Sequence, residues 1–244
     1  MIAYIDCSNG VSGNSILGSL IDCGLPFDSL KAMLNDLLIQ DDFKLIHEKI
    51  ECLGCKATYF DAIVKQSHDD QRRSIATIEA IINSSQLSDS IKKKAIGIFY
   101  TLGSALATAH QCDIQDVTFH ETKAIDTIID IVGTCWGLAY FNVDHIIASP
   151  LHIGSGSVTF KQNKWSIPVP ATKTLLENIP HYQTCIQGEL VTPTGAAIIK
   201  TCASTYTNYP VIDQSYIGYG APINTLDYPG WLILTIGKEK HETK

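Results

Sequence analysis

The chain has 244 residues, enough for one large domain or two small ones around a core that needs no disulfide or metal. Hydrophobic residues make up 45% and charged residues 18%, which excludes a disordered chain. The 18 Lys and Arg against 25 Asp and Glu give a net charge of −7, which argues against a general nucleic-acid binder and against docking on anionic lipid.

The cysteine content and the first residues indicate a reducing compartment. Eight cysteines are too few for a disulfide scaffold, and the opening MIAYIDCSNG lacks the cationic start of a secretory signal. The longest apolar stretch, 127–143, contains Asp130 and is too short and too polar to span a membrane. We therefore expect a cytoplasmic protein with free thiols that binds neither membrane nor nucleic acid.

Helical periodicity dominates the first part of the chain, after a short buried strand at residues 1–5. Two strands joined as a hairpin across the Cys52-Leu53-Gly54-Cys55 turn are expected at 44–50 and 57–64, and the polar run 65–73 predicts a loop. The helices expected here cover residues 11–23, 26–38, 75–82 and 88–110, the last of them capped by Ser88, and a further one begins near Glu121.

Strand signals dominate the second part of the chain. The strands expected there cover residues 146–149, 157–160, 164–167, 215–220 and 231–236, with short helices over 168–176 and 195–202. Helices first and strands later favour an α+β (mixed α/β) fold over a regular βαβ repeat. The composition changes near residue 144, so we expect one compact unit over 1–244 with lobes at 1–143 and 144–240.

The first candidate site is the segment that follows the first strand. It reads Asp6-Cys-Ser-Asn-Gly-Val-Ser12-Gly13-Asn14-Ser, a glycine-containing turn that leads into a helix. Backbone N–H groups and the positive end of the helix dipole at such a turn attract an anion. The alternative is a plain tight connection in which Ser12 or Asn14 only caps the helix.

The second candidate site pairs a histidine with carboxylates. Asp126 and Asp130 are four residues apart and share one helix face, and His120 and Glu121 stand at the start of that helix. Imidazole and carboxylates together suit a borderline divalent metal. The alternative is a solvated acidic face on which Lys123 pairs with Asp126.

A third candidate site lies at Val191-Thr192-Pro-Thr194-Gly195-Ala-Ala, where either threonine can cap the following helix and the small residues admit a ligand. A plain capped helix explains the same pattern. The Cys52-x-x-Cys55 pair has no second pair to complete a tetrahedral zinc site, so we assign it no function.

A series of longer motifs runs from the first strand to about Gly220. They read Asp6-Cys-Ser-Asn-Gly-Val-Ser-Gly13, Phe119-His-Glu-Thr-Lys-Ala-Ile-Asp126, Ile129-Asp-Ile-Val-Gly133, Ser149-Pro-Leu151, Gly154-Ser-Gly156, Pro168-Val-Pro170, Glu189-Leu-Val-Thr-Pro-Thr-Gly-Ala196 and Ile217-Gly-Tyr-Gly220. This series resembles the LarC family, the nickel insertion proteins of nickel-pincer cofactor biosynthesis.

The resemblance implies insertion of Ni(II) into pyridinium-3,5-bisthiocarboxylic acid mononucleotide, which yields the nickel-pincer cofactor of lactate racemase and related enzymes. It further implies a lyase-type metal chelatase that uses CTP with Mn or Mg on a C-terminal nucleotide-binding domain. The present chain looks like the short N-terminal half, without that domain. We therefore expect a C-terminal partner half or a fused form, and a homo-oligomer.

The chain departs from the family pattern near the expected metal site. The family usually has Asp where Asn14 stands, Met where Ser15 stands, a second His where Thr118 stands and Gly where Lys123 stands. Many members also carry a His-rich insert where only His68 remains here. Each change removes a metal ligand or adds a positive charge, so nickel capture is the step that these differences affect.

These observations lead to one main hypothesis. His120, Glu121, Asp126 and Asp130 hold or relay the metal, and Glu121 is the base that accepts the pyridinium C–H proton. The precursor's phosphate is bound at the two helix starts, by Asp6, Ser12, Gly13, Asn14, Thr192, Thr194 and Gly195. Two alternatives are a non-catalytic subunit that binds the metal, the precursor or a partner half, and an unrelated enzyme that acts on a phosphate-bearing ligand.

Overall fold

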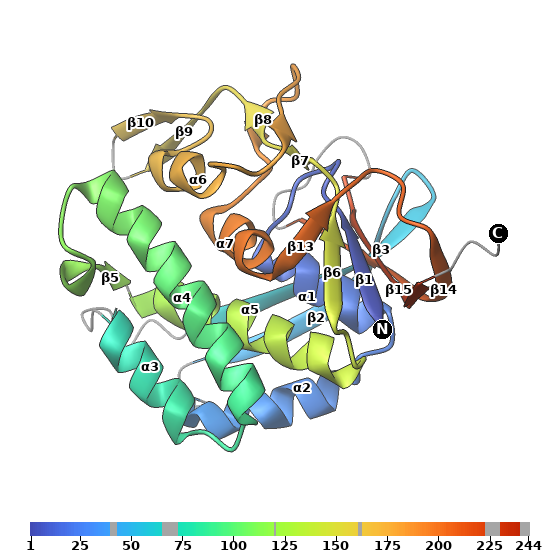
Figure 1. Ribbon diagram of the computed structural model, residues 1–244, viewed down its shortest axis with the longest axis horizontal. Coiled ribbons are helices and arrows are strands. Elements are labelled where there is room, and N and C mark those ends of the chain that lie inside the picture. Colours follow the sequence, from blue (N-terminus) through green and yellow to red (C-terminus); the bar gives the residue numbers. More distant parts are fainter. Residues whose placement is uncertain (40–42, 65–72, 120, 161–162, 223–229, 240–244) are drawn as a thin grey trace.

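The architecture is α+β, as the order of elements in the sequence predicts (Figure 1). A computed structural model describes residues 1–39, 43–64, 73–119, 121–160, 163–222 and 230–239. Within these ranges seven α-helices accompany one mixed seven-stranded sheet and four two-stranded sheets.

The main sheet has the strand order β13-β6-β1-β15-β14-β3-β2, and it takes strands from both sides of residue 144. β1 lies inside the sheet, parallel to β6 and antiparallel to the central strand β15. The bounds of its strands are β1 (Ile2–Asp6), β2 (Phe43–Cys52), β3 (Cys55–Val64), β6 (His145–Ala148), β13 (Ala203–Tyr206), β14 (Ile212–Gly220) and β15 (Leu232–Glu239).

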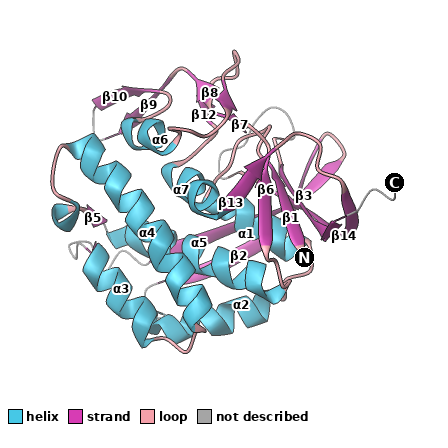
Figure 2. Cartoon of the chain, in the orientation of Figure 1, coloured by secondary structure: helices cyan, strands magenta, loops and turns pink. Residues whose placement is uncertain are grey.

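The helices gather on one side of this sheet (Figure 2). The central helix α5 is buried along most of its length, because its aliphatic side chains join those of α1, α2 and α4 in a single hydrophobic core. The helices are α1 (Gly13–Asp22), α2 (Phe27–Leu34), α3 (Ile75–Ser84), α4 (Asp89–His110), α5 (Glu121–Tyr140), α6 (Pro170–Leu175) and α7 (Pro193–Cys202).

The two-stranded sheets lie outside the main sheet. Their pairs are β4 (Arg73–Ser74) with β5 (Thr118–Phe119), β7 (Leu151–His152) with β11 (His181–Tyr182), β8 (Gly154–Ser155) with β12 (Gly188–Glu189), and β9 (Ser157–Phe160) with β10 (Asn163–Ser166). Three of the four are formed entirely by residues after 150, in agreement with the strand-rich second part expected from the sequence.

Most elements expected from the sequence are present, with two differences. The helix expected over 26–38 changes at Asn35 into a π-helical turn, Asn35–Ile39. Ser88 occupies the N-cap position of α4, but its hydroxyl lies 3.1 Å from Ser90 Oγ and makes no cap hydrogen bond. The expected loop 65–73 falls at residues 65–72 outside the described part.

The strand β13 is the main element that the sequence analysis missed. It follows α7 directly, without a glycine or proline to mark the change, and it pairs with β6 in parallel. Pairing between strands so distant in sequence leaves no local signal.

All eight cysteines lie in the described part and all are free thiols, as expected. No helix in the described ranges combines the length and apolar character needed to cross a bilayer.

Candidate functional site

The loop after β1 carries the first candidate residues. Asp6 Oδ1 accepts a hydrogen bond of 2.9 Å from the N–H of Ser8, so this carboxylate shapes the turn itself. Ser12 is the N-cap of α1 and forms a capping box with Ser15, whose N–H donates to Ser12 Oγ at 3.1 Å. The prediction that Ser12 caps this helix is confirmed.

The start of α7 lies against the same loop. Val11 N–H donates to the carbonyl of Leu190 at 2.8 Å, and Thr192 N–H donates to the carbonyl of Val11 at 3.1 Å. Thr192 is the N-cap of α7 and its Oγ1 accepts from the N–H of Gly195 at 3.1 Å. A Cβ at Gly195 would overlap the Val11 carbonyl, so glycine allows the two segments to meet.

A pocket of about 150 Å³ opens where these two helix starts meet. Because α1 and α7 both begin here, their N-terminal dipole ends and first-turn N–H groups favour an anion. Glu189 adds a carboxylate to the same pocket, which limits the favourable region to the helix side. The lining residues are Asn9, Gly10, Val11, Ser12, Ser15, Glu189, Leu190, Thr192, Pro222, Gly230 and Leu232.

Two of the seven residues expected at the phosphate, Ser12 and Thr192, line this pocket. The others have different surroundings. Asn14 Nδ2 donates towards Asp61 Oδ1 at 3.4 Å, and the space beside Gly13 is filled by Asp130. Asp6 forms the turn, Gly195 packs on the Val11 backbone, and Thr194 is a half-buried residue in the first turn of α7.

Asp130 is the most unusual carboxyl group of the molecule. Its side chain is only 3% exposed, and burial raises its pKa well above the usual 3.8, with further increases from the charges of Asp126 and Asp61. Oδ1 is buried and accepts no hydrogen bond from a described residue. A solvated acidic face is therefore wrong for Asp130, since this part of α5 is covered by the start of α1.

Asp61, on β3, is a third carboxylate in this region that the sequence analysis missed. It accepts hydrogen bonds from the Tyr59 hydroxyl at 3.0 Å and the Ala62 N–H at 2.8 Å. Burial, followed by the hydrogen bond to Asp61, raises the pKa of Tyr59 to about 12. Strand alternation in β3 gave no sign that Asp61 would approach a helix 65 residues later in the chain.

The proposed metal ligands are described only in part. Asp126 and Asp130 come together as expected, but His120 lies outside the described residues, as do the side chains of Glu121 and Lys123. Among the described residues, no group of three or more His, Cys, Asp or Glu is arranged to hold a metal ion. Glu121 begins α5, which carries both aspartates.

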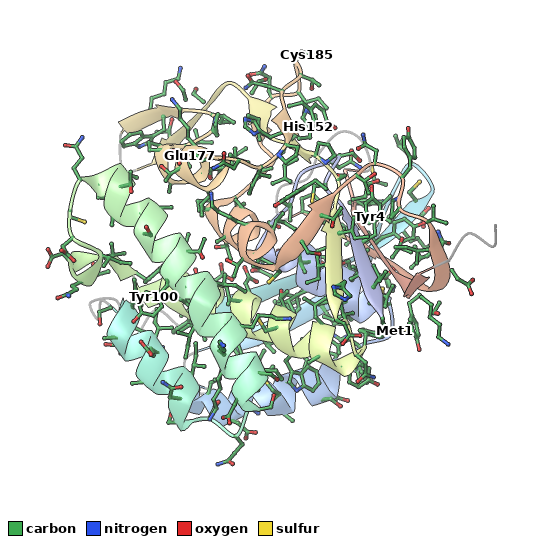
Figure 3. The ribbon with its side chains drawn as sticks, viewed as in Figure 1. Met1, Tyr4, Tyr100, His152, Glu177 and Cys185 are labelled. Atoms are coloured by element: carbon green, nitrogen blue, oxygen red, sulfur yellow. The ribbon has the colours of Figure 1, made fainter. Side chains whose placement is uncertain are left out.

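His152 is a further residue for which the sequence gave no signal. It is buried beneath the loop that ends at Cys185 in the view of Figure 3. Its Nδ1 lies 3.0 Å from the Ser8 carbonyl and its Nε2 lies 2.8 Å from Thr184 Oγ1. Its ring stacks on Tyr182 with centroids 4.8 Å apart. Because Ser8 O can only accept, Nδ1 donates to it, and His152 ties β7 to the loop after β1.

Comparison with known proteins gives the family. The family described as "Nickel insertion protein" matches residues 3–244. The chain belongs to this family. The resemblance noted in the motifs is thereby confirmed over nearly the whole chain.

Several curated relatives share more than a third of its residues. Proteins named "Pyridinium-3,5-bisthiocarboxylic acid mononucleotide nickel insertion protein" match from Desulfitobacterium hafniense (strain DSM 10664 / DCB-2) at 38% identity over 242 residues and from Geobacillus kaustophilus at 36% over 251 residues. Each match covers 99% of this chain, which spans only 60% and 61% of the length of these relatives. No solved structure matches the chain.

Proposed function

We propose that this chain contributes the N-terminal half of a system that inserts nickel into pyridinium-3,5-bisthiocarboxylic acid mononucleotide. The observation that carries the proposal is the meeting of two helix starts at one pocket, beside the buried carboxylate of Asp130. The pocket suits the phosphate of a mononucleotide, and the relatives of this chain are named for a mononucleotide substrate. The product would be the nickel-pincer cofactor of lactate racemase-type enzymes.

Nickel is the substrate of this reaction, and the start of α5 is where we propose that it binds. His120, Glu121, Asp126 and Asp130 offer one imidazole and three carboxylates, and Asp61 adds negative charge beside them. Forming a carbon–nickel bond releases the pyridinium C–H proton, and Glu121 is the group that we propose accepts it.

The remaining 40% of the relatives' length is the proposed source of the missing parts. CTP with Mn or Mg would bind on that C-terminal half, which would be supplied as a partner or as a fused form. With it, the system would act as a lyase-type metal chelatase in the cytoplasm. The chain itself would form one domain over 1–244, and we propose that it assembles as a homo-oligomer.

A second candidate function is a non-catalytic subunit that needs a C-terminal partner half and binds the metal or the precursor without turning it over. The exposed Thr118, where the family usually has a histidine, favours this alternative because a hydroxyl is a poorer nickel ligand than imidazole.

Product formation distinguishes the two functions. The purified chain is incubated anaerobically with the thiocarboxylated precursor, Ni(II), CTP and Mn, alone and with the C-terminal half of the Desulfitobacterium relative, and the nickel adduct is measured by mass spectrometry. We expect the adduct only when both halves are present. Nickel insertion by the chain alone would mean that no partner half is required, and no adduct in either case would favour the binding subunit.

Metal binding is tested separately by calorimetry with Ni(II). Asp126→Asn and Asp130→Asn should each weaken binding by about tenfold, since each replaces a carboxyl ligand with an amide. The matched control is Asp116→Asn, because Asp116 is an exposed aspartate on the short helix before β5. Equal nickel affinity in all four proteins would exclude α5 from the metal site.

A further inference from the structure

A second and larger pocket, of about 610 Å³, lies beside the hairpin of β2 and β3. A drug-sized ligand or nucleotide fits a pocket of this size, whereas the 150 Å³ at the helix starts holds only a small group such as a phosphate. Its lining residues are Asn9, Asp22, Lys49, Gly54, Cys55, Lys56, Tyr219, Trp231 and Ile233.

The topology of the sheet explains why this pocket exists. β2 and β3 pair along their whole length, down to Cys52 opposite Cys55. β3 pairs with β14, however, at one position only, Gly220 with Thr58. The tip of the hairpin therefore separates from β14, and a cleft opens between them.

One wall of the cleft carries two lysines, Lys49 and Lys56. Lys49 forms an ion pair with Asp22, which also accepts hydrogen bonds from Thr58 Oγ1 at 2.6 Å and from the Tyr219 N–H at 3.0 Å. Lys56 has only a distant partner, Glu51 at 3.9 Å, and its side chain is 72% exposed. Lys49 and two hydrogen-bond donors thus compensate the charge of Asp22. The exposed Lys56 remains available to an anionic ligand.

The opposite wall is aromatic. Tyr219 and Trp231 stand there beside Ile233. Trp231 is only 8% exposed, and its indole Nε1 is buried without a hydrogen-bond acceptor among the described residues. An unpaired buried donor costs free energy, so a ligand that brings a hydrogen-bond acceptor to Nε1 would bind more tightly.

The two pockets meet at Asn9, which lines both. The side-chain amide of Asn9 donates to the Trp231 carbonyl at 3.1 Å. Gly230 and Leu232 line the small pocket, and Trp231 and Ile233 line the large one, so the beginning of β15 separates them. Asn9 and the beginning of β15 therefore lie between the small pocket, which favours an anion, and the large pocket, which is lined by aromatic side chains and lysines.

We propose that the large pocket holds the pyridinium ring with its thiocarboxylate groups when the precursor is captured, while the phosphate of the same molecule lies in the small pocket. Nickel insertion at the start of α5 is a later step. This inference rests on the proposed function. The ring of Tyr219, which is 37% exposed, attracts a cationic ring, and Lys56 attracts its anionic substituents. The ribose spans the distance past Asn9.

Three stable probes test the inference by calorimetry on the full chain. Pyridinium-3-carboxylic acid mononucleotide carries ring, carboxylate and phosphate, its 3-carboxamide lacks the negative charge on the ring, and ribose 5-phosphate lacks the ring. Lys56→Gln should lower the affinity for the carboxylate probe by about tenfold, with little effect on the affinity for the carboxamide or for ribose 5-phosphate. Tyr219→Leu should lower the affinity for both ring-bearing probes by about threefold to tenfold and leave the affinity for ribose 5-phosphate unchanged.

Two further variants act as controls. Lys44→Gln removes an exposed lysine from the same strand as Lys49, outside the pocket, and should change nothing. Ser12→Asp keeps a good helix cap but puts a carboxylate into the small pocket, so it should weaken all three probes.

The outcomes separate the two proposals. If Lys56→Gln and Tyr219→Leu bind the ring-bearing probes as the wild type does, the ring lies elsewhere and the inference is wrong, while sensitivity of ribose 5-phosphate to Ser12→Asp would still support the phosphate site. If binding of the carboxylate probe depends on Lys56 and binding of both ring-bearing probes depends on Tyr219, but no probe responds to Ser12→Asp, the phosphate site is wrong instead. Wild-type protein that binds no probe at millimolar concentration would overturn both.

Discussion

The carboxyl group of Asp130 fills the space that a side chain at Gly13 would occupy, so the middle of α5 touches the first residue of α1. Gly13→Ala should lower the free energy of unfolding by about 1–3 kcal/mol, because a methyl group here overlaps Oδ2 and Cγ of Asp130. Urea unfolding measures this. The matched control is Gly97→Ala within α4, where the nearest atom to an added Cβ is 3.9 Å away. It should gain up to about 1 kcal/mol from helix propensity. A stabilised Gly13→Ala would contradict the contact.

Asp130 should make the stability of the protein depend on pH. Its pKa is raised in the folded state, mainly by burial, so the native protein keeps this proton at pH values where the unfolded chain has lost it. The free energy of unfolding therefore falls as the pH rises above the usual value of 3.8, by up to about 1.4 kcal/mol per pH unit, until native Asp130 ionises. Asp130→Asn stays neutral and should lack this slope. Urea unfolding between pH 4.5 and 8 in EDTA, at ~0.5-unit steps, compares the two slopes. Parallel slopes would show that Asp130 is ionised in the folded protein.

The eight cysteines should divide into three kinetic classes. Cys55, Cys112 and Cys185 are exposed. Burial raises the pKa of Cys23 to about 12 and that of Cys202 to about 11, and it raises the pKa of Cys7 and Cys135 as well. Because only thiolates react, an aromatic disulfide reagent at pH 8 should modify the three exposed thiols rapidly and Cys52 more slowly. The other four should react only after unfolding in denaturant. Rapid modification of any of these four, identified by peptide mass spectrometry, would contradict the described packing.

Glu189 should discriminate between two phosphate ligands. Its carboxylate lines the small pocket, so Glu189→Gln should tighten the binding of inorganic phosphate by about twofold to fivefold through the loss of repulsion. A carboxylate is also a good acceptor for ribose hydroxyls, and the same variant should weaken the binding of ribose 5-phosphate relative to inorganic phosphate. Calorimetry with both ligands gives the ratio. If the ratio of the two affinities is the same as in the wild type, Glu189 does not contact the ribose.

The parts of the site that are local in sequence could be predicted. Ser12 and Thr192 cap their helices because an N-cap is decided within about four residues. Their meeting depends on the pairing of Val11 with Val191, and no local pattern carries that information. The burial of Asp130 has the same origin, since the four-residue spacing from Asp126 is typical of a polar helix face until α1 covers it.

The large pocket could not be predicted for a related reason. Lys49 lies on β2, Tyr219 on β14 and Trp231 just before β15, and the cleft between them arises only because β3 leaves β14 after one residue pair. The family motifs included the Ile217-Gly-Tyr-Gly220 segment. They did not predict that its tyrosine lines a pocket, because that depends on the geometry of the sheet.

The neighbouring positions of β1 and β15 bear on how the protein is made. Ile2 pairs with Gly237, so β1 cannot complete its pairing in the sheet until β15 has been synthesised. Until then the nascent chain exposes one edge of β1 with unpaired N–H and C=O groups, and synthesis of the intervening residues takes roughly 10–50 s at typical rates. The helical layer can form during that time, because its contacts are more local. Translation that stops before β15 would therefore release a chain with an open sheet, and a chaperone that shields strand edges would be needed most at this stage.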